Sequence, residues 1–335
     1  MTMKINSLSN KNEKVLVTGG AGYVGSVLIE KLLINGYDVR VLDLMLFGAQ
    51  GLEKVKDKCE IIKGDIRDYE LLDKYLEGIT HVIHLAAISN DPCSDLDPEL
   101  TKQVNFEATK KLVELSKKKN VKRFIYASSS SVYGVKEMDN VTEELSLEPL
   151  TIYSETKMWS EDIVKKANDD NFTTVIVRPA TVCGYSPKMR LDLTVNILTD
   201  HAVNKKKITV FGGDQKRPNI HIQDITDYYV ALLSIEKEKI AGEIFNAGYE
   251  NHTVMEIAKM VKGVAGDVEI EVTNTKDNRS YHISSEKIKN VLALSPKYTI
   301  NDAIKEVKDA FDKGFIVYPA ISIYKNIDRM KEIGL

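Results

Sequence analysis

The sequence has few cysteines, no long apolar run and almost no net charge, and each shortage excludes a class of protein. Its three cysteines, Cys59, Cys93 and Cys183, are far apart, with no pair at the spacing of metal ligands. This usage argues against disulfides and against a zinc site, and it is typical of a reducing cytoplasm. We therefore expect a cytoplasmic protein without a bound metal.

No apolar run approaches the ~20 residues that a membrane-spanning helix needs. The first 14 residues are mostly polar and contain no apolar stretch resembling a signal peptide, so we expect residues 1–13 to form a flexible extension. The net charge of -3 gives no overall attraction to nucleic acid or to an anionic membrane. Neither is expected as a partner.

The first half of the chain alternates two kinds of pattern. Continuous apolar runs, typical of buried parallel strands, are separated by segments with apolar residues at helical spacing. This alternation predicts an α/β fold with a Rossmann-type doubly wound parallel sheet covered by helices on both faces. The expected strands cover 15–18, 38–43, 59–65, 81–87, 123–129 and 173–179, and the expected helices cover 24–35, 69–77, 98–119 and 152–168.

This rhythm breaks after residue 185. We interpret residues 1–185 as a dinucleotide-binding domain and residues 186–335 as a smaller mixed α/β substrate domain, with segments near 219–250 returning to the main sheet. In the second part we expect a helix over 190–204, short strands at 208–211, 243–246 and 268–272, and helices that start near Asp224, Thr253, Ser284 and Asn301.

A glycine-rich turn follows the first expected strand. Gly19, Gly22 and Gly25 are spaced three apart, at the start of the next helix. The first glycine permits the tight turn, the second lets a pyrophosphate approach the backbone, and the third lets the helix pack closely on the sheet. Because the helix N-terminus then faces the phosphates, this context predicts a dinucleotide site.

Asp43 ends the second expected strand, 18 positions after Gly25, where a carboxylate is expected to receive the adenosine ribose hydroxyls. A 2′-phosphate would be repelled there unless a cation offset the charge, and residues 44–47 include none. We therefore predict NAD rather than NADP. Asp65 and Ile66 follow the third strand and are expected to flank the adenine, although Asp65 is equally well placed to cap the next helix.

Tyr153 and Lys157 are four residues apart, so they share one face if the segment is helical. A nearby ammonium lowers a phenol's pKa from about 10, and such a pair is suited to take a proton from a hydroxyl while a hydride leaves the same carbon. The serine run 128–131 follows the fifth strand, and Ser129 precedes Tyr153 by 24 residues. A serine hydroxyl at that edge can hydrogen-bond the oxygen that Tyr153 deprotonates.

Together these motifs resemble the extended short-chain dehydrogenase/reductase family, in its nucleotide-sugar epimerase/dehydratase branch. The resemblance extends over nearly the whole chain. It includes the glycine turn, Gly64-Asp65, His84-Leu85-Ala86-Ala87, the serine run with Val132-Tyr133-Gly134, the Tyr153 and Lys157 pair, Arg178-Pro179, Arg217-Pro218-Asn219-Ile220-His221 and Ser295-Pro296-Lys297.

The resemblance implies that Tyr153 is the general base and acid, that Lys157 holds the nicotinamide ribose and tunes Tyr153, and that Ser129 is the catalytic hydroxyl. The residues expected to bind the cofactor are Gly19, Gly22, Tyr23, Val24, Gly25, Asp43, Asp65, Ile66, Leu85, Ala86, Ala87, Asn105, Tyr153, Lys157 and Pro179. Those expected to bind the substrate, with the arginines on its diphosphate, are Ser129, Ser130, Asn105, Thr181, Asn196, Arg217 and Arg279.

The implied chemistry is oxidation of the C4 hydroxyl of a nucleotide-diphosphate sugar, with NAD as the hydride acceptor. Family members that eliminate water place Asp-Glu directly after the catalytic hydroxyl residue, where this chain has Ser130 and Ser131, so a 4,6-dehydratase is disfavoured. The glutamate of decarboxylating members is missing there too. For Cys183, a buried structural thiol is favoured over a catalytic acid.

A 4-epimerase that recycles tightly held NAD is the favoured function. A one-way 4-dehydrogenase needs the same residues and stays open, whereas a non-catalytic nucleotide-binding protein is less favoured. By the same resemblance we expect a homodimer, paired through the helices near 98–119 and 152–168, and a role in polysaccharide biosynthesis. The sequence identifies neither the nucleotide nor the sugar.

Overall fold

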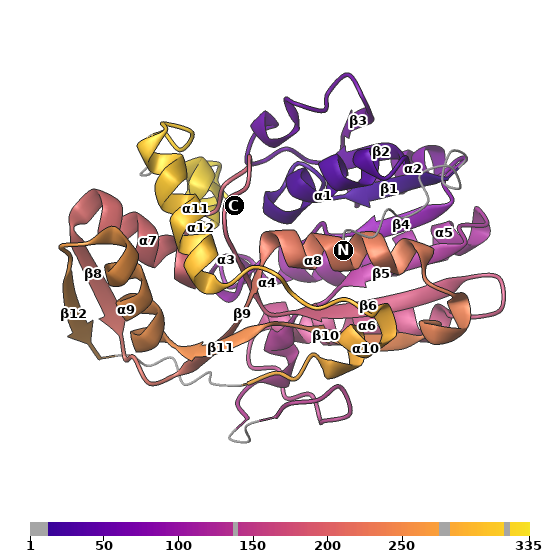
Figure 1. The fold of residues 1–335 in the computed structure, drawn as a ribbon. Helices are drawn as coiled ribbons and strands as arrows, with labels where there is room; N and C mark the ends of the chain where they lie inside the picture. The colour runs from indigo at the N-terminus through magenta and orange to yellow at the C-terminus, as the bar shows by residue number, and fades with distance from the viewer. Residues whose placement is uncertain (1–12, 137–139, 275–281, 318–321) are drawn as a thin grey trace.

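A seven-stranded parallel sheet forms the centre of the molecule (Figure 1). The computed structural model describes residues 13–136, 140–274, 282–317 and 322–335. The sheet contains β1 (Lys14–Thr18), β2 (Asp38–Asp43), β3 (Glu60–Lys63), β4 (His81–His84), β5 (Arg123–Ala127), β6 (Thr173–Pro179) and β10 (Glu243–Ala247). Their order is β10-β6-β5-β4-β1-β2-β3, and every neighbouring pair is parallel. The order reverses between β1 and β4, where a doubly wound sheet opens a crevice for a ligand.

Helices cover both faces of this sheet, so the predicted doubly wound α/β fold is confirmed. One face carries α1 (Tyr23–Ile34), α8 (Ile222–Ser234) and α10 (Glu286–Leu292), and the other carries α2 (Tyr69–Tyr75), α5 (Ala108–Lys118) and α6 (Ile152–Ala167). Successive residues of one strand enter opposite cores, as Val15 and Leu16 of β1 do. The centres of the strands are mainly apolar because both faces of the sheet are covered.

The single helix predicted over 98–119 is instead interrupted by a wider turn. It consists of α4 (Pro98–Lys102), a π-helical turn (Gln103–Glu107) and α5, and it follows the short helix α3 (Asp91–Ser94). Such turns are frequent at functional sites, and this one contains Asn105.

The second part of the chain adds two small sheets. β8 (Lys207–Phe211) pairs with β12 (Glu269–Thr273), and β9 (Lys216–His221) lies between β7 (Thr181–Cys183) and β11 (Glu250–Thr253). α7 (Thr194–Lys205), α9 (Val254–Ala265) and α11 (Ile300–Asp312) pack around a core of their own, and α12 (Asn326–Glu332) contacts α3. The division into domains at residue 185 stays a prediction. β10 lies in the segment near 219–250 that is expected to return to the main sheet, and it pairs there with β6.

The three strands of one small sheet, β7, β9 and β11, are not apparent in the apolar pattern, because polar residues and Pro218 interrupt it. The predicted start of a helix at residue 190 is wrong, since α7 begins at Thr194. The Arg190 carbonyl accepts a hydrogen bond from Asn196 Nδ2 at 3.0 Å, and the Leu191 N–H donates to the Tyr324 carbonyl at 2.7 Å. These backbone groups are therefore satisfied outside a helix.

Within the described ranges, no helix has the length and apolar character to cross a membrane. The same ranges contain no cluster of three or more histidine, cysteine, aspartate or glutamate side chains that could hold a metal ion. All three cysteines are free thiols, and burial raises the pKa of Cys183, which is 1% exposed. Cys183 therefore has the surroundings of a structural thiol.

A buried ion pair joins α6 to β6 near the carboxyl edge of the sheet. Arg178 donates to both oxygens of Glu161, with 2.9 Å from Nε to Oε1 and 2.6 Å from Nη2 to Oε2. Oε1 also accepts from the Ser128 hydroxyl at 2.5 Å, and Arg178 Nη1 donates to the Tyr133 hydroxyl at 2.7 Å. The two charged side chains are only 3% and 5% exposed. The pair therefore fixes the ends of β5 and β6 against α6.

Replacing Glu161 with alanine should lower the free energy of unfolding by about 3–5 kcal/mol, because the Arg178 charge would remain buried without a partner. Urea denaturation measures the loss. Glu53→Ala is the matched control: Glu53 pairs with Lys56 at an exposed site, where removing the carboxylate should cost less than about 1 kcal/mol. Equal losses in the two variants would contradict the structural role given to Glu161.

Candidate active site

The turn between β1 and α1 has room for a ligand because three side chains are missing. At Gly19 the φ angle is +74°, and an added Cβ would lie 2.7 Å from the Ala86 nitrogen. At Gly25 it would lie 2.5 Å from the Gly19 carbonyl oxygen. At Gly22 the nearest atom is the same oxygen at 3.1 Å, so the outer side of the turn stays open. This cradle fits the pyrophosphate of a dinucleotide, against the N-terminus of α1.

Asp43, the last residue of β2, is held at the edge of this turn. Its Oδ2 accepts the Ala21 N–H at 3.0 Å, and its Oδ1 accepts the Met45 N–H at 2.7 Å. Burial raises the pKa of Asp43, and these two hydrogen bonds act against that shift. Each carboxylate oxygen has a second lone pair, so the group can still receive ribose hydroxyls.

Asp65 makes a turn of its own. Its Oδ1 accepts the Arg67 N–H at 2.8 Å, and its Oδ2 lies 2.7 Å from Arg67 Nη2. The cap of α2 is Asp68, whose side chain accepts the Leu71 N–H at 3.0 Å. The alternative interpretation of Asp65 as the cap of the next helix is therefore wrong.

The cavity that contains Asp43 also contains a cation, which comes from a distant part of the sequence. Lys188 is 1% exposed and lines the same cavity as Asp43, with its Nζ 4.5 Å from the centre of the Phe47 ring. Burial lowers the pKa of Lys188 to about 7, Arg190 adds to the shift, and Asp192 and Asp43 oppose it. Within the described residues, Lys188 has no ion pair and no hydrogen bond from its ammonium.

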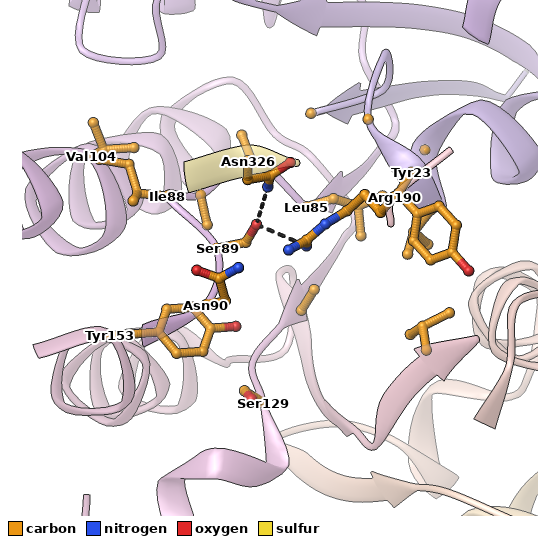
Figure 2. Close-up of a pocket in the computed structure, with 18 of the residues that line it drawn as sticks. Tyr23, Leu85, Ile88, Ser89, Asn90, Val104, Ser129, Tyr153, Arg190 and Asn326 are labelled. Carbon is orange, nitrogen blue, oxygen red and sulfur yellow. Dashed lines mark hydrogen bonds between the residues drawn. The ribbon is translucent and has the colours of Figure 1, made fainter. Parts of the chain in front are cut away.

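Most of the predicted site residues converge on one cavity of about 500 Å³, a volume typical of ligand sites (Figure 2). Arg279 lies outside the described residues. Whether each lining residue touches a ligand stays a prediction. Those that line the cavity are Gly19, Gly22, Tyr23, Val24, Gly25, Asp43, Asp65, Ile66, Leu85, Ala86, Ala87, Ser129, Ser130, Tyr153, Lys157, Pro179, Thr181 and Arg217.

Asn105 and Asn196 do not line this cavity, and they lie behind its wall. Asn105 Oδ1 accepts the Ile88 N–H at 2.8 Å, and its Nδ2 donates to the Ile88 carbonyl at 3.0 Å. Asn196 Nδ2 donates to the Tyr23 hydroxyl at 3.1 Å and to the Arg190 carbonyl at 3.0 Å. Because the protein itself uses both amides, the structure corrects the predicted ligand contacts: these asparagines position the segments that carry Ile88 and Tyr23.

Tyr153 and Lys157 lie in the first two turns of α6, which begins with a capping box at Thr151. Lys157 is 3% exposed, and its Nζ donates to the Ala127 carbonyl at 2.7 Å. The same Nζ lies 5.9 Å from the centre of the Tyr153 ring. Burial lowers the pKa of Lys157 to about 7. The predicted pair is thus present, with an ammonium that titrates near neutral pH.

The serine turn after β5 brings one hydroxyl into the space that the Tyr153 side chain also enters (Figure 2). Ser129 Oγ accepts the Ser131 N–H at 3.1 Å and the Ser131 hydroxyl at 2.9 Å. A hydroxyl has two lone pairs and one hydrogen. Since both lone pairs of Ser129 are occupied, its hydrogen is left to donate to a ligand in the cavity.

Residues 15–248 match the profile of the NAD dependent epimerase/dehydratase family. The chain belongs to this family. It is 31% identical to a UDP-glucose 4-epimerase from Lactobacillus helveticus in an alignment 314 residues long, which covers 87% of this chain and 94% of the relative.

Two solved structures show the same similarity. One is a UDP-glucuronic acid 4-epimerase from Bacillus cereus in complex with UDP-glucuronic acid and NAD, which is 29% identical, with a TM-score of 0.82 over 90% of this chain and 99% of that chain. The other is a UDP-glucose 4-epimerase from Thermotoga maritima with UDP-glucose, which is 25% identical, with a TM-score of 0.80 over 90% of this chain and 100% of that chain.

The predicted relationship to the nucleotide-sugar epimerase/dehydratase branch is confirmed by these comparisons, and the protein is an NAD-dependent enzyme of this type. The cofactor predicted from Asp43, NAD, is confirmed as well. In this chain the open glycine turn, the carboxylate of Asp43 and the buried ammonium of Lys157 fit such a dinucleotide.

Several cavity residues are not apparent in the sequence: Ser89, Asn90, Lys188, Arg190, Asp192 and Asn326. The first two directly follow the strand predicted over 81–87, so their place at a strand end was a usable signal. Arg190 and Asp192 lie at the start of the helix predicted over 190–204, Lys188 lies just before it, and Asn326 lies in α12 near the end of the chain. Only the folded arrangement brings these four to the cavity.

Replacing Lys157 with methionine should reduce the pH dependence of stability in the protein without NAD. Between pH 7 and about 10.4, the ordinary lysine pKa, the unfolded chain keeps a proton that folded Lys157 has lost, so Lys157 makes stability rise with pH. The free energy of unfolding of Lys157→Met, relative to that of the wild type, should therefore be highest near pH 7. This difference should shrink toward pH 10.

Chemical denaturation at a series of pH values measures this trend. The control is Lys54→Met at an exposed position. Parallel pH curves for the wild type and Lys157→Met would show that the Lys157 ammonium is not buried as the structure has it.

Proposed function

We propose that this protein is an NAD-dependent nucleotide-sugar 4-epimerase that acts through a transient 4-keto sugar. One observation carries the proposal: Tyr153, Ser129 and the buried Lys157 line the same cavity as the dinucleotide cradle. The alignment with a UDP-glucose 4-epimerase over 94% of that relative supports it, and makes a UDP-sugar the first substrate to test.

Each of the three side chains has a distinct part in the proposed reaction. Tyr153 takes the proton of the C4 hydroxyl and later returns it, as a general base and acid. Ser129 donates its remaining hydrogen to the same sugar oxygen and orients it. Lys157, fixed by the Ala127 carbonyl, places positive charge beside Tyr153. Bound NAD supplies the hydride acceptor and donor for C4.

Arg217 and Thr181 are the proposed contacts to the rest of the substrate. Both line the cavity. Arg217 offers a planar fork of donors that suits the oxygens of a diphosphate. Thr181 opens β7, directly beyond the β6 end at Pro179 and Ala180, which line the same cavity.

The serine turn argues against a dehydratase. Elimination of water needs an acid and a base beside the sugar, and the two residues after Ser129 are serines. The Ser131 hydroxyl is also turned back to donate to Ser129. A 4-dehydrogenase that releases the 4-keto sugar needs the same residues as the epimerase, so the fate of the hydride separates these two functions.

Incubation with UDP-glucose and catalytic NAD should produce the C4 epimer, without accumulation of reduced nicotinamide. Proton NMR identifies the epimer, and absorbance measures reduced cofactor. Tyr153→Phe should lower kcat by about 10²–10⁴, the usual contribution of a general base, with little change in UDP-glucose affinity. Tyr69→Phe, on the exposed end of α2, is the control.

Three results would decide against this proposal. Stoichiometric reduced nicotinamide or released ketone would identify the 4-dehydrogenase. Unchanged turnover in Tyr153→Phe would exclude the proposed base. If UDP-glucose is inert, a thermal-shift panel of UDP-, GDP-, dTDP- and CDP-glucose finds the nucleotide, since a ligand at 100 times its Kd stabilises the fold by about 2.7 kcal/mol; no shift with any of them would exclude a nucleotide-glucose substrate.

We also propose that the protein acts as a homodimer in polysaccharide biosynthesis, as the resemblance implies, and that it is cytoplasmic, as its cysteine usage suggests. The α4–α5 segment and α6 are the proposed contact helices. Phe106 and Trp159 support this choice, because their rings meet edge to face at 5.7 Å between these helices while both side chains stay partly exposed. Such aromatic residues are enriched at interfaces.

Sedimentation equilibrium should give twice the chain mass of 37.6 kDa. Trp159→Glu, which puts a charge on the proposed interface, should shift the protein toward the single-chain mass. Lys165→Glu, at an exposed position on the same helix, is the control for the charge change. A wild-type mass of one chain would contradict the dimer.

A further inference from the structure

The C-terminal helix α12 forms part of the cavity wall. Asn326 and Met330, one turn apart on α12, both line the cavity, as does Leu335 just beyond the helix. Between them, Arg329 Nε donates to the Leu46 carbonyl at 2.8 Å, which ties α12 to the loop after β2. The helix therefore spans from the adenosine side of the site to the loop after β4.

At the other end of this span, Ser89 receives two hydrogen bonds (Figure 2). Arg190 Nη1 and Asn326 Nδ2 each donate to Ser89 Oγ at 3.1 Å. Asp192 holds both donors, because its carboxylate accepts Arg190 Nε at 2.9 Å and Nη2 at 3.1 Å, and also the Asn326 N–H at 3.0 Å. The side chains of Arg190 and Asp192 are only 10% and 12% exposed.

The orientation of the Asn326 amide decides which group is the donor. With Nδ2 toward Ser89, one buried atom, Oδ1, has no partner. The opposite orientation would leave a buried NH₂ group with two unpaired hydrogens in its place. The first arrangement is less costly, so Asn326 donates and Ser89 accepts.

Both lone pairs of Ser89 are then occupied, and its single hydrogen has no acceptor among the described residues. The neighbouring groups place this hydroxyl near the reacting end of the cavity. Asn90 and Tyr153 both line this cavity, α3 packs against α6, and Asp91 Oδ1 accepts the Thr151 hydroxyl at 2.6 Å, at the start of α6. A ligand oxygen in this part of the cavity would meet a donor with a fixed direction.

We propose that the Ser89 hydroxyl donates a hydrogen bond to an oxygen of the substrate sugar, and that Asn326 of the C-terminal helix positions it together with the Arg190–Asp192 pair. The proposal rests on the proposed function, which brings a sugar beside Tyr153. Ser89 contacts the ligand directly. Asn326, Arg190 and Asp192 act through Ser89 and are positioning residues.

Isothermal titration with UDP-glucose, UDP and NAD tests the contact. Ser89→Ala should weaken UDP-glucose binding by about two- to tenfold, the loss expected for one hydrogen bond, with UDP and NAD binding unchanged. The loss should appear in KM as well as in Kd. Ser234→Ala, an identical change at an exposed serine of α8, should bind all three ligands as the wild type does.

Ser89→Cys is the second variant, for the case in which the alanine variant does not fold. It retains a side chain of similar size but replaces a strong donor with a weak one, so the same selective loss is expected. Circular dichroism of each variant verifies that the fold is retained.

A double-variant cycle tests the positioning. If Asn326 acts through Ser89, then Asn326→Ala weakens UDP-glucose binding in the wild type but has no further effect in Ser89→Ala. Additive losses would show that Asn326 acts independently and would overturn the positioning role. Equal losses for UDP and UDP-glucose in Ser89→Ala, or no loss for either, would overturn the sugar contact.

Failure of the Ser89 contact can be distinguished from failure of the proposed function. A wild-type protein that epimerises UDP-glucose while Ser89→Ala binds it normally refutes only the present inference. If the wild type uses another nucleotide, the glucose conjugate of that nucleotide replaces UDP-glucose in these titrations, and the corresponding nucleoside diphosphate replaces UDP. Binding of none of the four nucleotide-glucoses overturns both proposals.

Discussion

The buried pair of Glu161 and Arg178 connects the three elements that carry the reacting groups. Glu161 lies one helical turn beyond Lys157 on α6, and it accepts the hydroxyl of Ser128, the neighbour of Ser129. Arg178 is in β6, next to Pro179 at the cavity. Neither charge can move without leaving the other unpaired in a low-dielectric interior. The relative positions of helix, serine turn and strand end therefore have one stable arrangement.

Around this pair, the protein fixes hydroxyl groups by occupying their acceptor sites. Ser129 receives two hydrogen bonds from Ser131, and Ser89 receives one from Arg190 and one from Asn326. In each case only the hydrogen remains, and it can only donate. A rotatable group thus becomes a donor with one direction, at little cost when a ligand arrives. The two serines come from different strand ends and meet at one cavity.

The fold and the cofactor half of the site were predictable because their signals are local. The glycine turn, Asp43 and the Tyr153–Lys157 spacing each lie within one strand–turn–helix unit, where chain order determines geometry. Asn105 shows the limit of this reasoning: its position was predicted near the cavity, but a π-helical turn directs its amide to the Ile88 backbone. Local spacing does not reveal which partner a buried amide selects.

Most of the cavity residues that were not predicted have no local signal, because their positions depend on contacts between distant segments. Lys188 reaches Asp43 only because residues 184–190 pack on α1 and on the loop after β2, where Ser186 bonds Ser26 at 2.8 Å and Lys188 contacts Phe47. Asn326 reaches Ser89 only because Asp192 fixes its backbone N–H. No periodicity along the chain encodes either approach.

The placement of α12 also bears on how long the coenzyme remains in the protein. Lys188, Met330 and Leu335 enclose the cavity from parts of the chain that are remote from the glycine turn. A dinucleotide that contacts Met330 and Leu335 would lose these contacts if the final helix shifted, so the packing of α12 influences whether its exit competes with the return of the hydride to the sugar. A long residence makes NAD a prosthetic group regenerated in every cycle, whereas a short one makes it a co-substrate.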